Sequence, residues 1–294
     1  MFHDYIIADC RLRLAGEESD LVAMGLSSFL PFEAKSDGEP LLTVEMGYSI
    51  DAKALEREPL TEFDFEQGQA RCLFSRVSEG WLLEIVSEGQ PSHLFLYERG
   101  SHRVLCNAGE VETNLSFLRF GLWFVLNIAT TTQRVAAVHS SVIVKDGRAV
   151  MFLGESGTGK STHTRLWREN VEGAVLLNDD SPFVRATAEG VVVYGSPWSG
   201  KTPCYKQEYY SLQAIVRLSQ APHNKMRRLR AVESIGALLP SLPPAFAFDK
   251  VLEDATLNTL SALLRGAKVY HLECLPDAAA AHLSYETVFG NEAQ

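Results

Sequence analysis

The stretch that decides the fold is Gly154-Glu155-Ser156-Gly157-Thr158-Gly159-Lys160-Ser161, in the second half of this 294-residue chain. It satisfies the pattern G-x-x-x-x-G-K-S of a phosphate-binding loop, the Walker A motif. The glycines let backbone N–H groups converge on phosphate oxygens, and a following helix adds the positive end of its dipole. Lys160 reaches the outer phosphates, and the Ser161 hydroxyl binds Mg²⁺. The motif predicts a nucleotide site that uses ATP and Mg²⁺, formed by residues 154–161 and the adjoining Thr162.

The segments around this loop have the context that a phosphate loop requires. Residues 138–144 and 149–153 are rich in β-forming side chains and flank Asp146-Gly147, which predicts a hairpin. The second of these strands leads directly into Gly154. We therefore expect a strand, the loop and a helix in succession.

A pair of acids follows the loop at short spacing. Residues 175–180 read Val-Leu-Leu-Asn-Asp-Asp, an apolar strand that ends in Asp179 and Asp180. Such a run is often only a strand with a solvated acidic end. After a Walker A loop, however, a carboxylate on a neighbouring strand is needed to hold the metal. Two adjacent acids suit two roles, because one can serve the metal while the other accepts a proton from an attacking hydroxyl.

Taken together, His139, the loop 154–161 and the pair Asp179-Asp180 resemble the catalytic domain of the HPr serine kinase/phosphorylase family. The P-loop of that family is related to that of phosphoenolpyruvate carboxykinases. The resemblance covers about residues 135–200, and it implies that His139 lies near the transferred phosphoryl group and that the aspartates share the metal and base roles. By analogy with Walker B strands we assign the metal to Ser161 and Asp179 and the base to Asp180. The reverse order of the two aspartates stays open.

Two departures from the family bear on the acceptor. Thr162 stands where these kinases usually have Glu, and the downstream signature Glu-x-Arg-Gly-Leu-Gly has no match, since residues 193–201 read Val-Tyr-Gly-Ser-Pro-Trp-Ser-Gly-Lys. We therefore expect a kinase that keeps the phosphoryl-transfer core, with Asp180, His139 and Lys160 as catalytic residues. The acceptor would be a hydroxyl, such as a serine, of a protein, peptide or small molecule. The alternatives are a carboxykinase-related enzyme and a nucleotide-binding regulatory sensor with little turnover.

The segment 195–201 is rich in turn residues and carries Trp198 and Lys201. This composition is typical of a mobile active-site loop with an exposed aromatic residue, in which Lys201 stabilises phosphate charge. An ordinary surface turn has the same composition.

The rest of the chain indicates two domains and an α/β fold. Short β-like runs up to about residue 112 predict an antiparallel sheet. The apolar residues 115–129 predict a buried helix, because Arg119 and Asn127 interrupt a segment too short to span a membrane. We expect a β-rich N-terminal domain, residues 1–133, followed by an α/β P-loop kinase domain of the HPr kinase type, residues 134–294.

Charge and cysteine usage limit the partners. A net charge of −10 gives no general reason to bind nucleic acid, and the basic run 225–230 is expected to be a solvated helix face. The five cysteines contain no Cys-x-x-Cys pair, which argues against a disulfide framework or a zinc site. The N-terminus lacks the pattern of a signal peptide. These features favour a cytoplasmic protein with no membrane partner, and they leave a homo-oligomer open.

Overall fold

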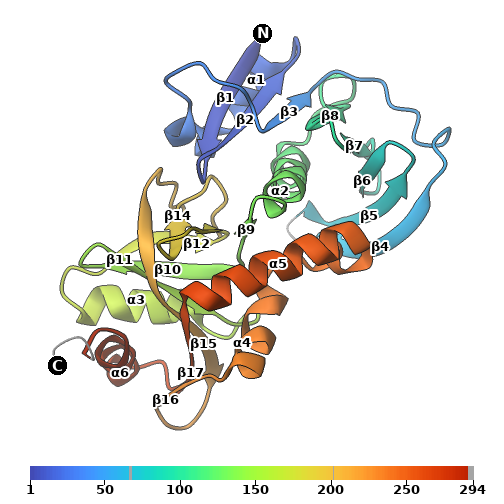
Figure 1. The fold of residues 1–294 in the computed structure, drawn as a ribbon. Helices are drawn as coiled ribbons and strands as arrows, with labels where there is room; N and C mark the ends of the chain where they lie inside the picture. The colour runs from blue at the N-terminus through green and yellow to red at the C-terminus, as the bar shows by residue number, and fades with distance from the viewer. Residues whose placement is uncertain (66–67, 201, 291–294) are drawn as a thin grey trace. The chain divides into compact units, whose positions relative to one another are not determined.

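The computed structural model describes residues 1–65, 68–200 and 202–290 and contains a mixed α/β chain with two large sheets (Figure 1). The chain divides into two compact units. The first comprises Met1–Gln133 together with Ala245–Asp254, and the second comprises Arg134–Pro244 and the described residues from Ala255 onward. Residues 245–254, which the sequence assigned to the second domain, thus pack with the first unit. The two-domain assignment itself stays a prediction.

The first unit is built on one eight-stranded sheet in the order β1-β2-β3-β8-β7-β6-β5-β4. β3 runs parallel to both β2 and β8, whereas the other neighbours are antiparallel. The expectation of a purely antiparallel sheet was therefore wrong at β3. Parallel pairing needs a long crossover, and α1 (Ser19–Gly25) lies in the segment that supplies it. The strands are β1 (Phe2–Ile7), β2 (Cys10–Ala15), β3 (Leu42–Glu45), β4 (Glu58–Phe65), β5 (Ala70–Val77), β6 (Gly80–Val86), β7 (His93–Glu98) and β8 (Arg103–Cys106).

The predicted apolar helix is α2 (Leu115–Thr131), and most of its residues are buried. It begins where the Asn114 side chain accepts hydrogen bonds from the N–H groups of Ser116 and Phe117, an N-cap that satisfies two otherwise unpaired donors. Phe124 packs edge-to-face against Phe74 of the sheet, with ring centroids 4.9 Å apart. Among the described residues, no helix has the length and apolar character to cross a membrane.

The second unit carries the other sheet, of nine strands. Its order is β12-β10-β11-β15-β14-β13-β9, with β17 beside β15 and β16 beside β17. β15 pairs in parallel with β11 on one side and with β17 on the other. The strands are β9 (Val135–Ala137), β10 (Ser140–Lys145), β11 (Arg148–Leu153), β12 (Val175–Asp180), β13 (Phe183–Ala186), β14 (Val191–Tyr194), β15 (Tyr209–Gln220), β16 (Lys225–Arg228) and β17 (Lys268–Cys274). The helices are α3 (Lys160–Asn170), α4 (Ala231–Leu238), α6 (Ala278–Phe289) and the part of α5 (Lys250–Gly266) from Ala255 onward.

Two local expectations have opposite outcomes in this sheet. The hairpin around Asp146-Gly147 is confirmed, since β10 and β11 pair antiparallel and both turn residues have positive φ, +49° and +72°. The basic run was wrongly predicted as a helix face. Most of it forms β16, antiparallel to β17 at the edge of the sheet. Met226 packs on the core while the flanking Lys225 and Arg227 stay exposed, which is the alternation of an edge strand.

Helices cover both faces of the second sheet. Phe152 and Val216 lie in the apolar cluster that contains Leu166 of α3 and Ala281 of α6. The neighbouring Met151, Leu153 and Ile215 lie in a separate cluster with residues of α4 and α5. This alternation follows from the period of a strand, whose successive side chains point to opposite faces.

The contact between α3 and α6 fixes the helix that follows the phosphate loop. Trp167 is completely buried, and its indole Nε1 donates to Ser284 Oγ at 2.8 Å. His163 Nε2 lies 3.1 Å from the same hydroxyl. Burial lowers the pKa of His163 to about 4, so that it is neutral at physiological pH.

This buried histidine predicts a pH dependence of stability. Between the ordinary pKa of 6.5 and the folded pKa of about 4, the unfolded chain binds a proton at His163 that the folded chain does not. The free energy of unfolding must therefore fall as the pH is lowered through this window. In His163→Gln, which retains a hydrogen-bonding group and does not titrate, the fall between pH 7 and pH 5 is expected to be about 2 kcal/mol smaller.

Urea unfolding at several pH values measures the difference. The matched control is His282→Gln, which replaces an exposed histidine on α6, the helix that carries Ser284. If the free energy of unfolding changed equally with pH in the wild type and in His163→Gln, the low pKa assigned to His163 would be contradicted.

Candidate functional site

The loop 154–159 leaves β11 and enters α3 directly, as the motif predicted. Gly157 and Gly159 have φ angles of +80° and +107°, a region that residues with a side chain rarely adopt. Gly159 is also the N-cap of α3. The loop therefore turns back beside the first turn of α3, whose N–H groups have no partner within the helix and are suited to bind an anion.

Lys160 lies folded onto this loop. Its Nζ donates to the carbonyl oxygens of Gly154 at 2.8 Å and of Glu155 at 3.3 Å. Burial lowers the pKa of Lys160, while attraction to Asp180 and Asp179 opposes that shift. The ammonium is thus held over the loop by weak carbonyl acceptors that a phosphate oxygen can replace.

Asp179 is anchored by two serines. Its side chain is buried, and its Oδ1 accepts hydrogen bonds from Ser141 Oγ at 2.7 Å and from Ser161 Oγ at 3.0 Å. Ser141 lies directly opposite Asp179 in the β10–β12 pairing, and Ser161 lies in the first turn of α3. Both bonds fall on Oδ1. The carboxylate therefore links the sheet to the start of the helix beside the loop.

Asp180 faces a histidine on the other side of the strand end. Its Oδ1 lies 3.6 Å from Nδ1 of His139, whose side chain is 50% exposed. Surrounding protein lowers the pKa of His139, and Lys160 adds to the lowering, while Asp180 and Asp179 raise it. Asp180 has a φ of +153°, which is uncommon for a residue with a side chain. The neighbouring aspartates thus engage different partners, Ser161 and His139.

The segment after β14 is packed against the end of β12. Asn178 is buried, and its Nδ2 donates to the carbonyl oxygen of Trp198 at 3.0 Å, while its Oδ1 accepts from the N–H of Ser181. Ser196 Oγ donates to the carbonyl oxygen of Ser181 at 2.6 Å. Trp198 is only 5% exposed, so the expectation of an exposed aromatic was wrong. A run of turn residues does not reveal that its aromatic ring packs on Phe183, 5.8 Å away. Lys201, which the sequence suggested as a phosphate ligand, lies outside the described residues.

The predicted residues differ in how closely they are brought together. Ser161 and Lys160 lie beside the aspartates, and Gly154 is buried under the loop. Glu155 instead extends to Arg217, with Oε1 3.4 Å from Nη2, and remains exposed. In the described part of the chain, the side chains of Ser156, Thr158 and Thr162 form no hydrogen bond with Asp179.

The oxygen atoms at this site fit a magnesium ion. Ser161 Oγ and Asp179 Oδ1 are hard oxygen donors 3.0 Å apart at the start of α3. Mg²⁺ is usually bound by one or two carboxylates together with substrate phosphates and water, so that it does not need an all-protein cage. Within the described ranges no group of three or more His, Cys, Asp or Glu side chains is placed to hold a metal.

The roles of two supporting residues were not predicted from the sequence. Ser141 anchors Asp179, and Asn178 anchors the 195–199 segment. For Ser141 a signal was present, since residues 138–144 and 175–180 were both predicted as strands. What the sequence lacked was the register, which places Ser141 opposite Asp179.

Comparison with known proteins yields little. No family model matches the chain, and no curated protein matches it. Among solved structures, one match is the HPr(Ser) kinase/phosphatase from Coxiella burnetii, which is 13% identical. The match covers 53% of this chain and 94% of that chain, with a TM-score of 0.31. We draw nothing on fold or function from a similarity this low.

The Asn178 hydrogen bonds predict that residues 196–199 are ordered. Asn178→Ala removes the hydrogen bond to the Trp198 carbonyl and the one from the Ser181 N–H, so a loss of about 1–3 kcal/mol in the free energy of unfolding is expected. Hydrogen–deuterium exchange should be slow at these residues in the wild type and faster in the variant. The control, Asn170→Ala, removes an asparagine whose amide donates to the Leu166 carbonyl within its own helix. Fast exchange at residues 196–199 in the wild type would favour the mobile loop.

Proposed function

We propose that this chain is an ATP-dependent phosphotransferase that moves the γ-phosphoryl group of ATP to a hydroxyl, such as a serine, of a protein, peptide or small molecule. One observation carries the proposal. Lys160, the Ser161–Asp179 pair and the Asp180–His139 pair meet at the end of the P-loop, where β11 and β12 end and β10 begins. These are the groups that phosphoryl transfer requires, namely a cation for the phosphates, oxygen ligands for a metal and a proton acceptor.

The loop and Lys160 would bind the triphosphate. The N–H groups of the loop and of the first turn of α3 offer donors, and the helix dipole favours an anion there. On binding, Lys160 would exchange the carbonyls of Gly154 and Glu155 for outer phosphate oxygens. A charge-assisted bond is stronger than the neutral one that it replaces.

Ser161 and Asp179 would hold Mg²⁺ at the start of α3. Held by these two residues, the ion would supply positive charge to offset the negative charge that develops on the phosphates. Ser141 keeps the Asp179 carboxylate oriented through its hydrogen bond to Oδ1. Ser141 is therefore a positioning residue and makes no contact with the reacting atoms.

Asp180 would accept the proton of the acceptor hydroxyl. As that proton passes to Asp180, the hydroxyl oxygen bonds to the γ-phosphorus, and the bond to the β–γ bridging oxygen breaks to release ADP. His139, 3.6 Å from the Asp180 carboxylate, orients it and lies beside the transferred group. The exchange of roles between Asp179 and Asp180 stays an alternative.

The Asp180–His139 pair favours turnover over a sensor role, because a sensor needs only the phosphate loop and its metal. Among the described residues, no feature of the site favours a carboxykinase-related reaction. The proposal places the protein in the cytoplasm, where ATP is available, and assigns residues 1–133 to acceptor choice or assembly.

The first functional prediction concerns Lys160. Lys160→Ala is expected to abolish phosphoryl transfer and ATP binding while leaving the melting temperature of the free protein within a few degrees, because the lysine bonds only to loop carbonyls. The matched control is Lys206→Ala, since Lys206 Nζ also donates to a main-chain carbonyl, that of Leu176 at 2.8 Å, outside the phosphate loop. MgATP should raise the melting temperature of the wild type and the control but not of Lys160→Ala. Equal shifts in all three proteins would contradict the phosphate site.

The second separates the aspartates. Asp180→Asn should lower transfer by about 10²–10⁴-fold with little change in MgATP affinity, because an amide cannot accept the proton. Asp179→Asn should weaken Mg²⁺-dependent ATP binding instead. Calorimetric titration and a transfer assay measure both, with Asp146→Asn in the β10–β11 turn as the control. The opposite pattern would exchange the roles, and normal transfer in both variants would refute the kinase reaction.

A further inference from the structure

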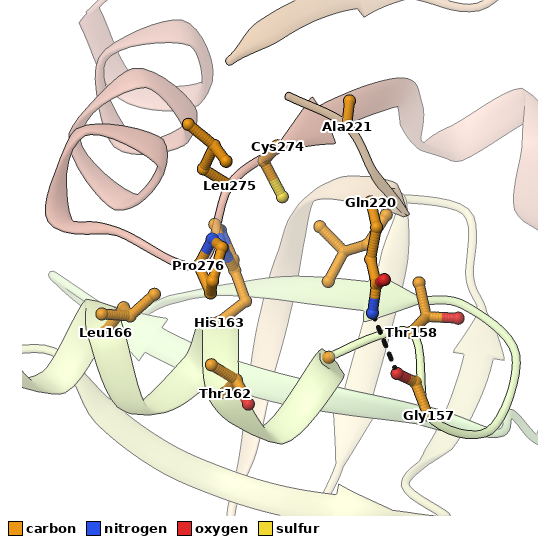
Figure 2. Close-up of a pocket in the computed structure, with 12 residues that line it drawn as sticks. Gly157, Thr158, Thr162, His163, Leu166, Gln220, Ala221, Cys274, Leu275 and Pro276 are labelled. Carbon is orange, nitrogen blue, oxygen red and sulfur yellow. Dashed lines mark hydrogen bonds between the residues drawn. The ribbon is translucent and has the colours of Figure 1, made fainter. Parts of the chain in front are cut away.

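A cavity of about 540 Å³ opens beside the phosphate loop (Figure 2). One wall is formed by Gly157, Gly159 and Thr162 of the loop and of α3. The opposite wall comes from Ala221 after β15 and from residues 274–276 after β17. A volume in this range suits a ligand of nucleoside size. The cavity therefore adjoins the place where the phosphates would bind, so one ligand can occupy both.

The side chains in this cavity are neutral and mostly apolar. Leu166, Leu218 and Pro276 line it, and among the described residues no Asp, Glu, Lys or Arg does. His163 also lines it but is held on Ser284, and burial keeps its pKa low. A charged ligand would lose hydration here without gaining an ionic partner, whereas a flat, uncharged ring would gain apolar contact.

The far wall is fixed in advance by a single asparagine. Asn224 Oδ1 accepts from the N–H of Leu275 at 2.8 Å, and its Nδ2 donates to Asp277 Oδ1 at 2.9 Å. The same Asp277 caps α6 by accepting from the N–H of Ala280. The 274–276 turn is thereby tied to a helix N-terminus, so that little ordering is needed when a ligand binds.

Gln220 places one polar group in the cavity and connects it to the loop. Its Nε2 donates to the carbonyl oxygen of Gly157 at 3.3 Å, the bond drawn in Figure 2. This bond fixes which end of the amide is the donor. In the described part of the chain Oε1 makes no hydrogen bond, so it can accept one from a ligand.

From these observations we propose that the cavity binds the nucleobase of the nucleotide, and that Gln220 Oε1 selects a purine with an exocyclic amino group over one with a keto group at the same position. This assignment rests on the proposed function, since it requires phosphates in the adjoining loop. It identifies Gln220 as a specificity-determining residue and explains a neutral apolar cavity next to a highly polar site.

Calorimetric titration of the full chain with MgATP and with magnesium tripolyphosphate, which lacks base and ribose, tests the cavity. ATP should bind at least tenfold more tightly in the wild type. Ala221→Phe fills the rim of the cavity and should remove this advantage while tripolyphosphate binding stays unchanged. The control, Ala188→Phe, introduces the same ring at an exposed turn between β13 and β14 and should behave as the wild type.

Inosine triphosphate, which has a keto group in place of the adenine amino group, tests Gln220. The wild type should prefer ATP by about fivefold, the effect of one hydrogen bond, and Gln220→Met should bind both nucleotides with equal affinity. Equal binding of ATP and tripolyphosphate by the wild type would overturn the cavity assignment while leaving the phosphate site intact. Equal binding of ATP and inosine triphosphate by the wild type would overturn the selection by Gln220. If neither ATP nor tripolyphosphate binds, the proposed function fails and the inference fails with it.

Discussion

Burying a carboxylate costs free energy unless the carboxylate is hydrogen-bonded. The site is organised around a buried carboxylate that has such hydrogen bonds. Asp179 accepts hydrogen bonds at one oxygen from Ser141 on β10 and from Ser161 on α3. These two bonds fix the end of β12 against the neighbouring strand and against the first turn of the helix that follows the phosphate loop. The positions of Lys160, Asp180 and His139 depend on this arrangement, because each lies on one of the elements so joined or next to it.

The sheet and the helices supply the rigidity that this arrangement needs. Trp167 and His163 hold α3 on α6 through Ser284, so the start of α3 cannot shift freely relative to the strands. Asn178 ties the segment after β14 to the end of β12. On the other side of the loop, Asn224 and Asp277 fix the turn after β17 that closes the proposed base cavity. Side chains placed this way are largely preorganised for a ligand, as expected of a binding or catalytic site.

Local sequence patterns predicted those elements that are determined by residues close together in the chain. The strand before Gly154, the helix after it, the Asp146-Gly147 hairpin and the strand that ends in Asp180 each follow from a few adjacent residues. Non-local pairing was not predictable in this way. The parallel strand β3 and the Ser141–Asp179 contact depend on which strands meet and in which register, and the edge strand β16 replaces a predicted helix because it pairs with β17. Trp198 was assigned to the surface because a run of turn residues gives no indication that the ring packs on Phe183.

The central claim is that this constellation transfers a phosphoryl group rather than only binding a nucleotide. The most direct measurement is the transfer of label from ATP labelled at the γ-phosphate into a cell extract, by the purified full chain with Mg²⁺. The expected result is labelled product that requires the enzyme and is stable to acid, as a phosphate ester is; a product on a serine of a protein would also be labile to alkali. ATP that binds at the site with no labelled product above the enzyme-free background would contradict the claim and leave a nucleotide sensor.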